Sequence, residues 1–72
     1  MLEIGKVYIA PWTVKTSNGP IEDKEPILIL KLIDFLTKSD QYYYKILKSN
    51  NITSVMVVSG VACREHWKKL KC

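Results

Sequence analysis

The sequence predicts a small, mainly β domain: a barrel of four to five antiparallel strands that finishes in a short helix or a last strand. Segments rich in β-branched and aromatic residues alternate with short polar segments that contain turn residues. A chain of 72 residues can bury only one thin core. Closing the sheet into a barrel removes the edges that a four-stranded sheet exposes. We therefore expect a single domain over residues 1–72.

The first part of the chain predicts a strand followed by a long loop. Residues 4–14 contain strand formers and then Pro11, which cannot donate to a sheet and therefore indicates an edge, a bulge or a strand end. Residues 15–26 are polar and include the turn signal Asn18-Gly19-Pro20. We expect these polar residues to form an exposed loop.

The next segment is almost entirely apolar. Residues 27–35 are rich in β-branched side chains and follow Pro26, which favours a second strand. A helix that begins at Pro26 is the alternative, because Leu28, Leu32 and Leu36 recur every fourth residue.

The second half predicts a hairpin. Residues 37–41 read as a polar turn, and residues 42–48 and 52–59 have the side chains of strands. Residues 49–51, Ser-Asn-Asn, suit a tight turn because asparagine tolerates the left-handed region.

The segment 61–72 is compatible with a last short strand or with a helix. Ser59 could cap the N-terminus of such a helix. Cys63, Trp67 and Leu70 would then share one helical face.

Strand alternation gives an expected core and an expected contact surface. We expect the core to contain Val7, Ile9, Leu30, Leu32, Ile46, Val55 and Val57. If the leucines of the second strand face inward, Ile27, Ile29 and Ile33 face outward and need a cover. The C-terminal helix, a bulge that turns the strand, or another chain would supply it, and the last of these makes the three isoleucines candidate partner-binding residues. Trp12, beside Pro11, is a fourth candidate, either closing the barrel end or binding a partner. A protein partner or a homo-oligomer is therefore expected.

The basic residues gather in the C-terminal part. Residues 1–44 carry five lysines against six acids, whereas residues 45–72 carry six basic residues against Glu65. Basic side chains beside strand aromatics are typical of surfaces that bind single-stranded nucleic acid. The candidate nucleic-acid-binding residues are Tyr43, Lys45, Arg64, Lys68 and Lys69.

The sequence lacks the patterns of known catalytic and metal sites. Cys63, His66 and Cys72 are three candidate zinc ligands, whereas a structural zinc site takes four. A Cys63–His66 nucleophile pair has only Glu65 as a nearby acid, and no phosphate-binding glycine motif is present. We expect no enzyme, no cofactor and no metal. Without a signal-peptide pattern or a membrane-length apolar segment, the expected location is cytoplasmic.

Several segments in this order resemble SH3-like barrels, most closely the small barrel proteins of tailed bacteriophages. The resemblance rests on Ile4-Gly5-Lys6-Val7-Tyr8, the long loop, the apolar second strand, Tyr43-Tyr44-Lys45-Ile46-Leu47 and His66-Trp67-Lys68-Lys69-Leu70. It implies a non-catalytic interaction module, a structural or accessory component of a virion or a host-directed binder, located in the host cytoplasm or the virion. The loop acids and paired prolines of peptide-binding SH3 domains are missing, so proline-rich ligands are not implied. A small basic nucleic-acid-binding barrel is the alternative.

Overall fold

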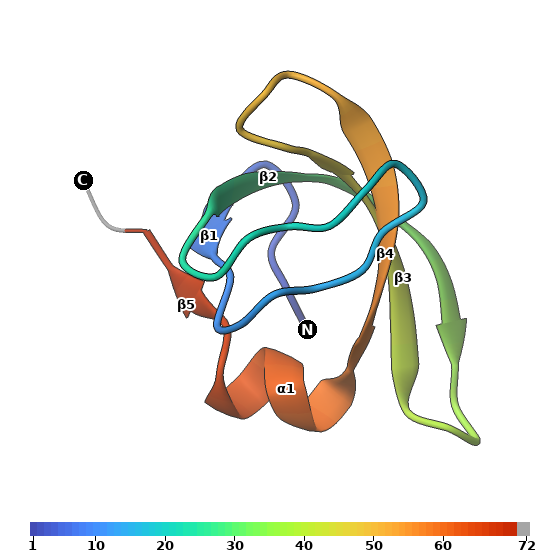
Figure 1. The fold of residues 1–72 in the computed structure, drawn as a ribbon. Helices are drawn as coiled ribbons and strands as arrows, with labels where there is room; N and C mark the ends of the chain where they lie inside the picture. The colour runs from blue at the N-terminus through green and yellow to red at the C-terminus, as the bar shows by residue number, and fades with distance from the viewer. Residues whose placement is uncertain (71–72) are drawn as a thin grey trace.

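The computed structural model describes residues 1–70 and confirms the mainly β fold with a short C-terminal helix (Figure 1). All paired strands are antiparallel, in the order β4-β3-β2-β1-β5. The elements are β1 (Val7–Ile9), β2 (Pro26–Leu36), β3 (Gln41–Leu47), β4 (Thr53–Ser59), α1 (Gly60–Glu65) and β5 (Lys68–Lys69). The strand interpretation of the apolar second segment is therefore correct, and the helix alternative is wrong.

The long loop between β1 and β2 covers the side of the barrel that the strands leave open. Val14 and Ile21 pair across the loop. At its tip, Thr16 forms a bridge with Met56, and the Ser17 N–H donates to the Val55 carbonyl at 3.0 Å. The sheet is not closed strand to strand, since β4 and β5 are its two edges. The tip of the loop therefore pairs with the edge of β4 at the place where, in a closed barrel, another strand would pair.

The tight turn between β3 and β4 confirms the predicted hairpin. The Lys48 N–H donates to the Ile52 carbonyl at 3.0 Å. The two strands pair from Leu47 opposite Thr53, next to the turn, to Gln41 opposite Ser59 at the far end. Asn51 adopts a φ of 66°, in the left-handed region that asparagine tolerates.

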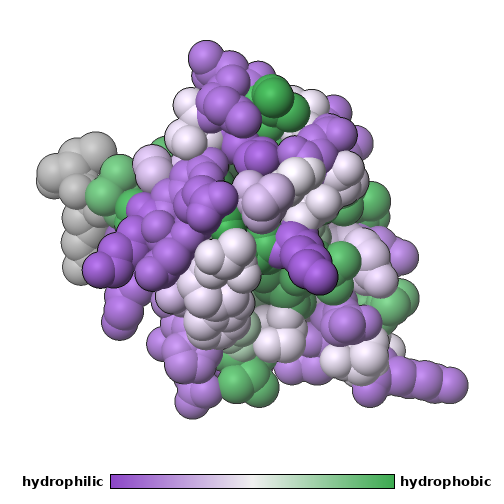
Figure 2. All heavy atoms as spheres, in the orientation of Figure 1, coloured by the Kyte–Doolittle hydropathy of each residue, from purple (hydrophilic) through white to green (hydrophobic). Residues whose placement is uncertain are grey.

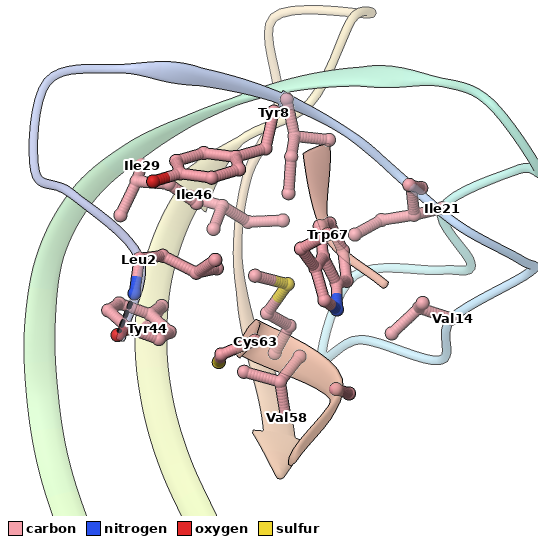
Figure 3. Packing of buried hydrophobic residues seen from close by; sticks show 14 of the residues in the cluster. Leu2, Tyr8, Val14, Ile21, Ile29, Tyr44, Ile46, Val58, Cys63 and Trp67 are labelled. Atoms are coloured by element: carbon pink, nitrogen blue, oxygen red, sulfur yellow. Dashed lines mark hydrogen bonds between the residues drawn. The ribbon is translucent and has the colours of Figure 1, made fainter. Parts of the chain in front are cut away.

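The core lies between the curved sheet, the long loop and α1 (Figure 3). Leu2, near the N-terminus, points into it, and its N–H donates to the Tyr44 hydroxyl at 2.9 Å. Trp67 packs into the same cluster from the segment after α1. The fully buried large side chains are Leu2, Ile21, Ile27, Ile29, Tyr44, Ile46 and Met56.

Most of the expected core is wrong, because the strands present their other face to the interior. Of the expected set only Ile46 is buried; Val57 is exposed, and Val7, Ile9, Leu30, Leu32 and Val55 are half-buried. Alternation separates the two faces of a strand but does not say which one is inside. The inner face carries Tyr42, Tyr44 and Ile46 in β3, and Met56 and Val58 rather than Val55 and Val57 in β4.

Two irregularities in β2 change which of its residues face inward. The pairing with β3 shifts between Ile29 and Lys31 and again between Leu32 and Asp34. A β-bulge of this kind inserts one extra residue and increases the local coiling of a strand. As a result Ile29, Leu32 and Phe35, each three residues apart, lie opposite the alternate β3 residues Ile46, Tyr44 and Tyr42.

The C-terminal segment forms both structures that the sequence left open, a helix and then a short strand. The Ser59 side chain caps α1 as expected and accepts the Ala62 N–H at 3.1 Å. Cys63 and Trp67 are buried, whereas Leu70 is exposed. The helix packs on β4 and joins it to β5, at the end of the barrel (Figure 1), so it does not extend over the whole of β2.

Candidate functional site

The four predicted partner-binding residues separate into two groups. Ile27 and Ile29 lie in the core and are fully buried, so their expected outward orientation is wrong. The cause is the face of β2 that turns inward, together with its bulges. Ile33 and Trp12 are exposed at 47% and 46%, and both remain available to a partner.

Ile33 belongs to an apolar surface that sequence reasoning did not recognise in full. Phe35 and Leu36, both exposed, follow it at the end of β2. The Phe35 ring stacks on Tyr42, with centroids 4.3 Å apart and planes inclined by 22°. We call Ile33, Phe35 and Leu36 the hairpin patch. It occupies both faces at the end of the β2–β3 hairpin, because Phe35 lies opposite Tyr42 and Leu36 lies opposite the preceding residue, Gln41. The signal in the sequence was the length of the apolar run, which continues beyond the three residues of β1 that pair with β2.

The hairpin patch lies where β2 and β3 project beyond the rest of the sheet (Figure 1). β1 pairs with β2 only from Pro26 to Leu28, and the preceding residues Gly5 and Lys6 extend the contact to Ile29. Within residues 1–70, no segment pairs with that side of β2 beyond Ile29. An open hollow lined by Phe35, Leu36 and residues 37–39 lies at the end of the same hairpin.

Two of the basic candidates face each other across the sheet. Lys45 lies directly opposite Lys31, and both side chains are exposed. Tyr43 lies on the same face of β3 as Lys45 and is half-buried between Asp34 and Val57. Like charges in direct cross-strand register repel each other. This face could therefore accept an anion between the two lysines.

The remaining basic candidates lie apart from this face. Lys68 and Lys69 form β5, and β2 and β1 separate β5 from β3 in the sheet. Lys69 forms an ion pair with Glu3, and this hydrogen-bonded contact holds the pKa of Glu3 below its usual value. Arg64 lies 3.9 Å from Asp40. The five candidate nucleic-acid-binding residues are thus not assembled into one surface.

Trp12 contacts the end of α1. Its ring meets His66 edge to face, with centroids 5.1 Å apart and planes inclined by 62°. Trp67, the next residue, is buried, and its indole N–H has no hydrogen-bond partner among the described residues. Trp12 therefore packs on the barrel end and keeps almost half of its surface exposed, and its role in partner binding stays a prediction.

The thiol considered for catalysis lies in the core, and the imidazole lies against Trp12. Burial raises the pKa of Cys63, which disfavours the thiolate needed for nucleophilic attack. His66 packs against Trp12. In residues 1–70 no group of three or more His, Cys, Asp or Glu side chains is arranged to hold a metal ion. Cys72, the third residue of the zinc alternative, lies outside the described residues.

Comparison with protein-family models, with curated proteins and with solved structures finds no match for this chain. The resemblance to bacteriophage barrels therefore stays a prediction. Within residues 1–70, none of the helices has the length and apolarity needed to cross a membrane.

Proposed function

We propose that this protein is a non-catalytic protein-binding module whose contact surface is the hairpin patch. The observation that carries the proposal is the concentration of Ile33, Phe35 and Leu36 within four residues on a projecting hairpin. Apolar area removed from water is worth roughly 25 cal/mol per Å². A role as a structural or accessory component of a bacteriophage is the biological setting that the resemblance implies.

Clustering on both faces of one hairpin end, rather than exposure alone, distinguishes these three residues. Ile52, in the turn between β3 and β4, is exposed to the same 47% as Ile33 but has no exposed apolar neighbour in its own turn. Single exposed apolar residues are normal on soluble proteins, whereas contiguous groups mark contact sites. On the face of the molecule that Figure 2 shows, apolar side chains form separate green groups among polar ones.

A photo-crosslinking amino acid placed at residue 33 tests the proposal, and the same group at residue 52 is the matched control. When the substituted protein is expressed in cells of its native source, we expect a discrete crosslinked species for the probe at residue 33 and none for the probe at residue 52. Mass spectrometry of the adduct identifies the partner. Equal labelling at both positions, or no discrete species at residue 33, would contradict the proposal.

A second candidate function, binding of single-stranded nucleic acid, is favoured by the Lys31–Lys45 pair beside Tyr43. A phosphate between the lysines would relieve their repulsion, and counterion release would make binding weaken steeply as salt rises. Fluorescence anisotropy with a labelled oligonucleotide tests it, with Lys45→Gln as the variant and Lys38→Gln, in the turn after β2, as the control. Absence of binding at low salt would remove this candidate.

A further inference from the structure

The free edge of β2 presents backbone hydrogen-bonding groups as well as apolar side chains. Ile29 directs both of its backbone groups away from β3: its N–H donates to the Lys6 carbonyl at 3.0 Å, and its carbonyl accepts the Gly5 N–H at 2.7 Å. In an antiparallel pair, residues with this orientation alternate with residues that bond to the partner strand. Ile29 lies opposite Ile46 of β3, and Leu32 and Phe35 lie opposite Tyr44 and Tyr42, which follow at every second residue of β3. Their backbone groups therefore also point to the free edge.

Most of these edge groups have no partner within residues 1–70. The Phe35 N–H is the exception, because the Asp34 carboxylate accepts it at 2.8 Å, and a strand that pairs with this edge must displace that carboxylate. The Leu32 N–H, the Leu32 carbonyl and the Phe35 carbonyl remain directed outward. An edge of this kind is a template for another strand.

The edge is complementary to itself. Two copies related by a two-fold axis normal to the sheet would form one continuous antiparallel sheet. In that sheet, residues that lie opposite each other must point to the same face, which restricts the possible registers. If Leu32 lies opposite Phe35 of the other copy, both belong to the inner face, because they lie opposite Tyr44 and Tyr42 of β3. Lys31 and Leu36 then meet on the outer face. The bulge between Leu32 and Asp34 occurs in both copies, so each strand has two residues between Leu32 and Phe35 and the register of the pairing is maintained.

Charge supports the same arrangement. Lys31 and Asp34 are the charged residues of β2, both are exposed, and both belong to the outer face. An antiparallel pairing brings Lys31 of each copy diagonally beside Asp34 of the other, within reach of a lysine side chain. A parallel pairing in register would instead bring like charges together.

We propose that two copies of this protein form a dimer by antiparallel pairing of residues 31–36 of β2 along their free edges. This inference rests on the proposed function and names its partner. The turn that begins at Thr37 limits the pairing at one end, and the contacts of Ile29 with Gly5 and Lys6 limit it at the other. The short ladder makes the dimer weak and dependent on concentration, as expected for a small interface.

Sedimentation equilibrium of the purified protein, from micromolar to millimolar concentration, tests the dimer. Lys31→Glu places a second carboxylate beside Asp34 of the other copy, and Asp34→Lys places two ammonium groups together, so each variant alone should associate at least tenfold more weakly. An equimolar mixture of the two variants restores opposite charges at both contacts and should associate like the parent. Lys38→Glu makes the same charge change outside the paired residues and should leave the dimer unchanged. Circular dichroism verifies that each variant is folded.

Amide hydrogen exchange gives a second readout that needs no substitution. The Leu32 amide should exchange freely in dilute solution and become protected as concentration rises, while the buried Ile46 amide stays constant. A parent protein that remains monomeric, or a mixture of variants that does not recover, would overturn the dimer. A monomeric purified protein that still gives a discrete heterologous crosslink at residue 33 would overturn the dimer and leave the proposed function standing.

Discussion

Truncation of two adjacent residues of β2 tests which face of this strand builds the core. Ile29 is fully buried, whereas Leu30 is half-buried beside the first bulge. Both side chains have four carbons, so substitution of either by alanine removes the same number of atoms. A difference in the free energy of unfolding between Ile29→Ala and Leu30→Ala therefore reflects how deeply each side chain is buried, and not how many atoms are removed.

The magnitude follows from the burial of each side chain. Truncation of a fully buried isoleucine costs about 2–5 kcal/mol, because transfer energy is lost and a cavity remains. Leu30 keeps part of its surface in water in the folded state, so we expect its truncation to cost about 1 kcal/mol. A domain of 72 residues has a total stability of about 4–11 kcal/mol. Ile29→Ala therefore removes a large share of it.

Urea unfolding followed by tryptophan fluorescence measures both losses, since Trp67 is buried in the core. The midpoint should fall much further for Ile29→Ala than for Leu30→Ala, with similar denaturant slopes. If Ile29→Ala does not fold, the milder Ile29→Val, expected to cost about 0.5–1.5 kcal/mol, replaces it. A loss at Leu30 equal to or larger than that at Ile29 would refute the inward face described above.

Two further predictions concern buried or crowded positions. Burial raises the pKa of Tyr44 to about 12, so the folded protein retains a proton that the unfolded chain releases near pH 10, and the free energy of unfolding should fall by up to about 2–3 kcal/mol between pH 10 and pH 12. In urea unfolding experiments, Tyr44→Phe should flatten this part of the stability profile. The same variant loses the contact with the Leu2 N–H, which lowers stability by about 1–3 kcal/mol at neutral pH. A side chain at Gly60 would meet the Asp40 carboxylate, which is the exposed end of a flexible side chain and can move away. Gly60→Ala should therefore cost less than about 1 kcal/mol in the parent and nothing in an Asp40→Gly background. Urea unfolding that shows equal losses in both backgrounds would show that the clash is not the cause.

The strand locations were predictable because they depend on local composition. Residues 42–48 and 52–59 are rich in strand formers, and the Asn-containing turn between them suits only a short reversal, so the hairpin follows from local preference. The Ser59 cap is likewise a local hydrogen bond. The hairpin patch was predictable only in part: Ile33 was recognised, whereas Phe35 and Leu36 were not, because their exposure depends on where β1 ends.

By itself, the sequence determined the four main strands in their order along the chain, the long loop and the reversal between β3 and β4, because backbone preferences act over a few residues. It left the short fifth strand open. The tertiary structure alone decided which face of β2 is buried. Both of its faces are apolar, so alternation could not separate Ile29 from Leu30. The choice depends on the Tyr42 and Tyr44 rings of the neighbouring strand and on two bulges that shift the pairing, and these arise only when distant segments pack together.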